Sequence, residues 1–86
     1  MNRLLIRGEM FGQFQYLYVF HGEQMIEKLG VTMDDMQETV FSLIQKHNIK
    51  HIDLSGAHRF MLGIEDQLKR ASIETYSLDD ISFRYI

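Results

Sequence analysis

The sequence predicts a small α/β domain, in which two helices pack on a small mixed β-sheet; an α+β arrangement is the alternative. Three stretches predict it. Residues 14–20 alternate apolar side chains on both faces, residues 32–47 repeat them at helical spacing, and residues 49–71 are patterned as strand, loop and helix. The expected element order is β-β-(β)-α-β-α-β, with the third strand, residues 24–29, left open.

A single domain, residues 1–86, is expected because the chain contains no proline, no repeat and no linker-like segment. Its 45% hydrophobic and 24% charged residues are typical of a globular protein. There is no cysteine, so disulfides and thiolate metal sites are excluded. Small domains without such cross-links often self-associate, which favours a homo-oligomer, most simply a homodimer.

The formal net charge of −3 argues against a strongly basic nucleic-acid binder, although it leaves a local basic patch open. No apolar run approaches the roughly 18 residues that a membrane span needs. At the N-terminus a charge recurs after three apolar residues, which is too short for a signal-peptide core. We therefore expect a cytoplasmic protein without a membrane partner.

The first half of the chain is patterned as a hairpin followed by a helix. In the strand 14–20 one face is aromatic and the other carries Leu17 and Val19, which predicts a central strand covered on both sides. Thr32 and Asp35 resemble a capping box at a helix start, and Asn48 suits the left-handed cap at its end. The apolar face of this helix comprises Met36, Val40, Leu43, Ile44 and His47.

The second half is patterned as a strand over residues 49–54, a helix over residues 57–71, and extended chain over residues 73–78 and 81–86. Whether the last two segments are separate strands or one strand with a bulge stays open. A strand, a helix and a strand in succession imply a right-handed crossover and a parallel pair.

A candidate anion site lies in the loop between that strand and helix. Ligands of open α/β sheets tend to bind beyond the carboxyl ends of the strands, and the free N–H groups of a helix start favour anions. The predicted site residues are Ser55, Gly56, Ala57, His58 and Arg59. The alternative is that Ser55 only caps the helix and Gly56 only turns the chain.

The same segment, IKHIDLSGAHRFMLGIEDQLKRASIETYSL, carries a family resemblance, which extends over residues 41–78. It resembles the second adenosine-contacting motif of the actin/Hsp70/sugar-kinase superfamily through Ile52, Leu54, Ser55, Gly56, Gly63, Ile64 and Leu68. The resemblance implies a half-domain of ribonuclease-H-like fold. It departs from the family where the usual paired glycine is Gly56-Ala57.

Catalysis and metal binding are not expected. Active ribonuclease-H-like nucleases hold two metal ions with converging carboxylates, including an Asp on the first strand, and residues 3–7 contain none. Asp53, Asp79 and Asp80 have no spacing that demands a cation, and the four histidines lack helical or strand ligand spacing. His51 and Asp53 share a strand face, so a structural pairing between them is expected. No catalytic residue, cofactor or metal is predicted.

An interaction surface is predicted from the aromatic strands. Its residues are Tyr16, Tyr18, Phe20, Phe83 and Tyr85. Aromatic side chains on an open sheet stack nucleic-acid bases or anchor protein interfaces. The strand 14–20 has no interleaved Lys or Arg, which argues against base stacking and for a protein partner or a second copy.

The sequence thus favours a small non-enzymatic protein-interaction or regulatory module. Its size and composition suggest an accessory or inhibitor protein of a phage or mobile element. The alternatives are a nucleotide- or anion-binding domain that uses residues 55–59 and, less favoured, a metal-dependent nuclease.

Overall fold

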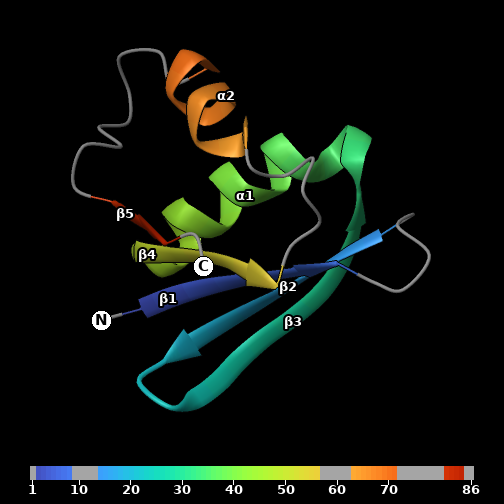
Figure 1. The fold of residues 1–86 in the computed structure, drawn as a ribbon. Helices are drawn as coiled ribbons and strands as arrows, with labels where there is room; N and C mark the ends of the chain where they lie inside the picture. The colour runs from blue at the N-terminus through green and yellow to red at the C-terminus, as the bar shows by residue number, and fades with distance from the viewer. Residues whose placement is uncertain (1, 9–13, 57–62, 72–80, 85–86) are drawn as a thin grey trace.

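A computed structural model describes residues 2–8, 14–56, 63–71 and 81–84 (Figure 1). The elements in chain order are β1 (Asn2–Gly8), β2 (Phe14–His21), β3 (Gln24–Thr32), α1 (Met33–His47), β4 (Ile49–Gly56), α2 (Ile64–Ala71) and β5 (Ser82–Arg84). The predicted small α/β class is confirmed, and the segment left open at residues 24–29 is a strand that continues to Thr32.

The five strands form one mixed sheet in the order β3-β2-β1-β4-β5. β1 and β3 both pair antiparallel with β2, whereas β4 lies parallel to β1 and β5 parallel to β4. The two parallel pairs follow from the helices that connect the strands, because a parallel neighbour needs a long crossover connection. Between β2 and β3 the chain reverses direction at Gly22, whose φ of 63° suits a tight turn.

Both helices lie on one side of the sheet (Figure 1). Each strand between the sheet edges turns alternate apolar side chains toward them, among them Leu4, Leu17 and Ile52, which are fully buried. From α1 the core receives four residues of the predicted face, Met36, Val40, Leu43 and Ile44, and from α2 it receives Ile64 and Leu68. Apolar burial between one sheet face and two helices therefore holds the domain together.

The ends of α1 match the sequence in part. Asn48 has the left-handed conformation expected of a C-cap, with φ 50° and ψ 53°, and its N–H donates to the carbonyl of Ile44. At the other end Thr32 is the N-cap residue, but its hydroxyl hydrogen bonds the carboxylate of Asp35 at 3.3 Å instead of a helix N–H. The predicted helix over residues 57–71 is described from Ile64 onward, and residues 57–62 and 73–78 lie outside the described residues.

The prediction that β2 is covered on both sides is wrong. On the helix side Leu17 and Val19 are fully buried, whereas on the other side Tyr16, Tyr18 and Phe20 are only partly buried. No described helix lies on that second side. Its aromatic rings contact side chains of the neighbouring strands instead. This side of the sheet, on which no described helix lies, is called the open face below.

Candidate binding face of the sheet

The open face is assembled by strand register. Residues that stand opposite each other in paired strands project to the same side, so the pairs Arg3 with Phe20 and Arg3 with His51 place three strands' side chains together. The same register logic adds the remaining members. The open face comprises Arg3, Leu5, Arg7, Tyr16, Tyr18, Phe20, Met25, Lys28, His51, Asp53, Ser82 and Arg84.

Cations lie over the three rings of β2, which we call the aromatic row. The guanidinium carbon of Arg3 is 4.8 Å from the centre of the Phe20 ring. The ammonium nitrogen of Lys28 is 5.8 Å from the Tyr16 ring and 5.5 Å from the Tyr18 ring. Such cation–π contacts contribute about 0.5–1 kcal/mol each at exposed sites. The positive charges missing from β2 itself are therefore supplied by β1 and β3.

The backbone of β3 allows the Tyr16 ring to lie close against the sheet. A Cβ atom placed on Gly30, the partner of Tyr16, would stand 3.3 Å from Cε1 of that ring. A larger residue at position 30 would push the ring outward, because so short a contact leaves little room. Gly30 thus leaves room for the Tyr16 ring against the backbone of β3.

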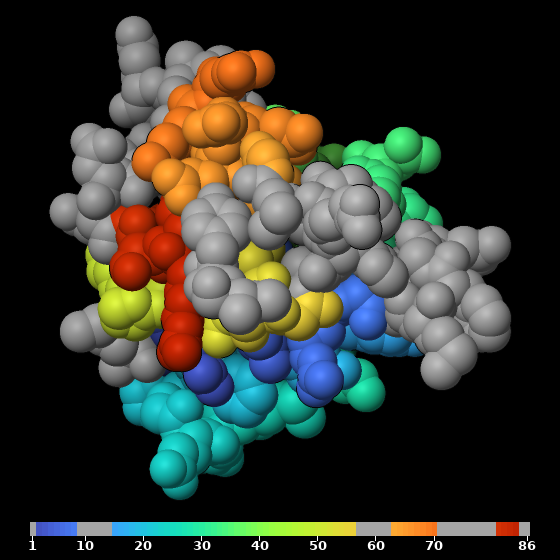
Figure 2. Space-filling view, viewed as in Figure 1, coloured from blue at the N-terminus to red at the C-terminus, as the bar shows by residue number. Residues whose placement is uncertain are grey.

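A small cavity adjoins the aromatic row where β1, β4 and β5 run side by side. Its volume is about 150 Å³, and its lining residues are Arg3, His51, Ile52, Asp53, Ser82 and Arg84. In the space-filling view, red β5, yellow β4 and blue β1 follow one another across the surface, with the β2–β3 hairpin in cyan below (Figure 2). Two arginines from different strands therefore flank one polar hollow.

Asp53 is the carboxylate of this cavity and is 9% exposed. Burial raises the pKa of its carboxyl group, but the hydrogen bond from the Ser55 N–H at 2.9 Å and the positive charges of Arg84 and Arg3 outweigh burial. The net result is a pKa below the ordinary value of 3.8. Asp53 is consequently ionised at neutral pH and offsets part of the positive charge of the two arginines.

The candidate anion loop is described only at its first two residues. Ser55 and Gly56 end β4 and are exposed, while Ala57, His58 and Arg59 lie outside the described residues. The Ser55 N–H is already used by Asp53. A Cβ atom on Gly56 would stand 3.0 Å from Cγ of Arg7, so this glycine allows β1 and β4 to approach closely.

The predicted interface residues do not all share one face. Tyr16, Tyr18 and Phe20 lie together on the open face. Phe83 stands opposite the buried Ile52 and packs against the core on the helix side, with the Lys69 ammonium 5.9 Å from its ring centre. Tyr85 lies outside the described residues, as do Asp79 and Asp80.

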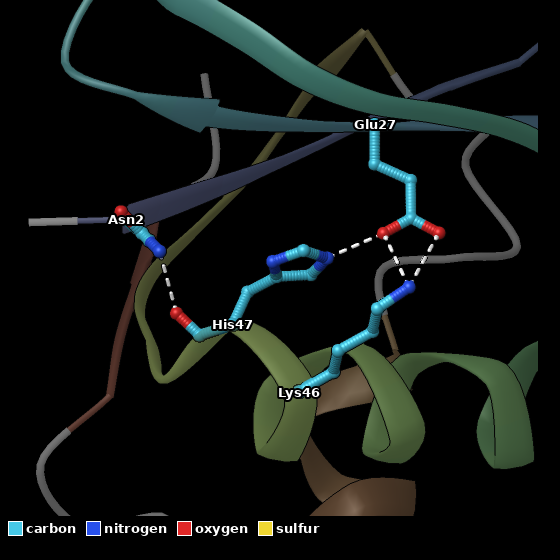
Figure 3. Close-up of polar contacts among 4 residues, drawn as sticks. All are labelled: Asn2, Glu27, Lys46 and His47. Carbon is cyan, nitrogen blue, oxygen red and sulfur yellow. Dashed lines mark hydrogen bonds and ion pairs between the residues drawn. The ribbon is translucent and has the colours of Figure 1, made fainter.

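A second polar cluster joins the helix side of the sheet to the end of α1 (Figure 3). The carboxylate of Glu27 on β3 accepts hydrogen bonds from the His47 ring and from the Lys46 ammonium, the latter at 3.3 Å. Asn2 on β1 donates through its amide to the His47 carbonyl at 2.6 Å. The His47 hydrogen bond is the main reason that the pKa of Glu27 lies below its ordinary value. This cluster anchors a helix end.

Metal chemistry finds no support in the described part of the chain. Within it, no group of three or more His, Asp or Glu side chains is placed to hold a metal ion. His51 and Asp53 line the same cavity, as their shared strand face predicted. Among the described residues, no helix is long and apolar enough to cross a membrane.

Comparisons with known proteins give no relative from which a function could be inferred. No protein-family model, no curated protein and no solved structure matches the chain. The resemblance to the actin/Hsp70/sugar-kinase superfamily therefore stays a prediction. The cations of the open face were missed in the sequence because they come from three strands other than β2. Their signal was the alternation Arg3, Leu5, Arg7, which becomes informative only once the register is known.

Proposed function

We propose that this chain is a non-enzymatic interaction module that binds an anionic macromolecule through its open face. The observation that carries this proposal is the uncovered aromatic row, overlaid by Arg3 and Lys28. Aromatic and arginine side chains are the groups that most often dominate binding energy at interfaces. Here they lie beside one another on a sheet face that no described helix covers.

The sign of the charge on this face is opposite to that of the whole chain. Arg3, Arg7, Lys28 and Arg84 belong to the open face, on which Asp53 is the only carboxylate among the described residues, in a chain whose net charge is −3. Complementary charge steers association and selects partners. An anionic partner is therefore attracted to the open face and repelled by the remainder of the surface.

Self-association was the other partner expected from the sequence. A two-fold dimer buries the same patch on both copies, so pairing through the open face would bring its arginines and Lys28 toward those of a second copy. Like charges placed opposite each other are destabilising. The proposal therefore assigns the open face to a different molecule, and a role as a phage or mobile-element accessory protein stays a prediction from size and composition.

The test is a titration with anionic polymers at low ionic strength, followed by fluorescence anisotropy. Polyglutamate and single-stranded oligonucleotides serve as probes for the wild type, Lys28→Gln and Arg7→Gln, with Arg70→Gln as the matched control. Arg70 is an exposed cation at the end of α2, away from the open face. We expect at least one polymer to bind, and each open-face variant to weaken that binding several-fold while the control leaves it unchanged.

Two results would overturn the proposal. One is that no anionic polymer binds at low salt. The other is that Arg70→Gln weakens binding as much as Lys28→Gln, because this would show only a nonspecific effect of net charge. Nucleotide binding by residues 55–59 stays a prediction from the sequence; of the two described residues of that loop, Ser55 already donates its N–H to Asp53.

A further inference from the structure

We propose that the anionic partner is a single-stranded nucleic acid, with one backbone phosphate in the cavity between Arg3 and Arg84 and bases on the aromatic row. This inference rests on the proposed function, because it names the partner of the same open face. It is carried by three independent features of the described residues: the cavity's donors, its net charge, and its position beside the rings.

The donors of the cavity suit a phosphate group. Arg3 and Arg84 reach the cavity from β1 and β5, on either side of β4. A guanidinium presents a planar fork of N–H donors that matches two phosphate oxygens, and Ser82 adds a hydroxyl donor at the same place. The volume of about 150 Å³ exceeds the roughly 30 Å³ of one water several-fold, which leaves room for a phosphate.

The net charge of the cavity favours a phosphodiester. Asp53 is ionised, so it cancels one of the two arginine charges and leaves one unit of positive charge. A backbone phosphodiester carries a single negative charge, whereas a phosphorylated side chain carries about −1.5 to −2 at neutral pH. The negative charge of Asp53 therefore repels a phosphomonoester more strongly than it repels a phosphodiester of a polynucleotide backbone.

The cavity continues directly into the aromatic row through Arg3. Arg3 lines the cavity, and the central carbon of its guanidinium lies 4.8 Å from the centre of the Phe20 ring. The rings of Phe20, Tyr18 and Tyr16 follow at alternate positions of β2, about 6.6 Å apart along the strand. The flexible Lys28 side chain lies over two of these rings, so a base that stacks there displaces its ammonium group, which can then meet a further phosphate.

Flat rings beside cations distinguish nucleic acid from an acidic polypeptide. Nucleic-acid bases stack on aromatic rings and on arginine guanidinium planes. The Asp and Glu side chains of an acidic polypeptide have no flat ring to stack, so they would interact only with the positive charges of the open face. The bases must be unstacked to reach such rings, and in a duplex they are paired and enclosed. A single strand is thus the form of nucleic acid that can use both features of the open face.

The experiment measures anisotropy of labelled oligo-dT and oligo-rU, with a duplex of equal length and polyglutamate as comparison ligands. The cavity is tested by Arg84→Gln against the matched control Arg70→Gln. The row is tested by Tyr18→Leu against Tyr18→Phe, which keeps the aromatic face. Circular dichroism and thermal melting confirm that each variant is folded, and Arg84→Lys tests the cavity with its charge retained.

We expect single strands to bind about tenfold more tightly than the duplex or polyglutamate. Arg84→Gln and Tyr18→Leu should each weaken binding about tenfold, while Arg70→Gln and Tyr18→Phe stay within about twofold. For Arg84→Gln the slope of log K against log salt should fall by about 0.7, the value for one phosphate contact on a single strand.

The possible failures are distinguishable. If polyglutamate binds through Lys28 and single strands do not, the interaction module stands and the nucleic-acid inference is overturned. If single strands bind but Arg84→Gln behaves like Arg70→Gln, the cavity is not the phosphate site. If Tyr18→Leu binds as tightly as Tyr18→Phe, the rings do not stack bases. If neither polymer binds, the proposed function falls together with this inference.

Discussion

At the scale of single residues, Glu27 joins β3 to the last turn of α1 through His47 and Lys46 (Figure 3). The pKa of Glu27 in the folded chain lies below its ordinary value of 4.5 because the folded state hydrogen bonds the ionised form. A lowered folded-state pKa stabilises the fold above the unfolded-state pKa, and this contribution is lost as the pH falls through the folded-state value. The ion pairs of Glu27 are consequently sensitive to acid.

We expect Glu27→Gln to lower the free energy of unfolding at pH 7 by about 1 kcal/mol, a modest effect because the cluster is partly exposed. The difference from the wild type should shrink as the pH falls below 4.5 and be lost once the pH has passed through the lower folded-state pKa of Glu27, as the wild-type carboxyl protonates. Urea unfolding at several pH values measures it, with the exposed Glu38→Gln as control. Parallel stability curves for wild type and Glu27→Gln would contradict this assignment.

Gln15 is the other residue whose environment makes a quantitative prediction. Its side chain is fully buried on the helix side of β2, and within the described structure neither amide atom has a hydrogen-bond partner. Burying an amide without a partner costs about 1–3 kcal/mol. We expect Gln15→Leu to raise the free energy of unfolding by about 1 kcal/mol, whereas Gln45→Leu, at an exposed position, changes it little. A loss of stability in Gln15→Leu would show that the amide is satisfied.

At the scale of elements, the turn from α1 into β4 depends on the left-handed conformation of Asn48. A residue with a Cβ and no local hydrogen-bonding group pays about 1 kcal/mol to adopt it, whereas glycine pays none. We therefore expect Asn48→Ala to destabilise the protein by about 1 kcal/mol and Asn48→Gly to be neutral or slightly stabilising. Thermal unfolding measures both variants. Equal losses in the two would mean that the Asn side chain, and not its backbone conformation, matters.

The elements with strong local signals were predictable from the sequence. The face of α1 and its cap at Asn48 follow from helical spacing and one residue preference, and both are confirmed. Residues 24–29 were ambiguous because Met25 and Ile26, adjacent in the chain, are both exposed near a register shift in the β2–β3 pair. That irregularity breaks the alternation by which a strand is recognised.

The open face was predictable only in part. Tyr16, Tyr18 and Phe20 follow from alternation within one strand, but the cations beside them depend on how strands far apart in sequence align. The pair Arg3 and His51 lies in a parallel register that no local pattern specifies. A shift of the register by one residue would turn each side chain to the other face of the sheet. Because the register of β5 is not visible in the sequence, Phe83 was grouped with Tyr16, Tyr18 and Phe20, although it lies on the opposite face from them.

At the scale of the whole molecule, the two sides of the sheet differ in cover and charge. The helices lie on one side (Figure 1), and α1 begins with the acidic residues Asp34 and Asp35. Within the described ranges, the open face on the other side carries four cations and one buried carboxylate. This polarity orients an anionic partner before contact, and it opposes the approach of a second copy in the face-to-face orientation.

The charge of the open face disfavours its use in the homodimer expected from size and composition. Among the described residues the exposed large apolar side chains are Met25, Ile26 and Met33, and of these Met25 stands opposite Phe20 at the end of the open face. We expect sedimentation at low ionic strength to show no dimer that depends on the open face. Lys28→Gln and Arg70→Gln should then sediment alike. Added salt screens repulsion between copies, so it should leave association unchanged or raise it. A dimer present at low salt, weakened by salt and by Lys28→Gln alone, would show that the open face pairs with itself and would remove the charge argument for a different partner.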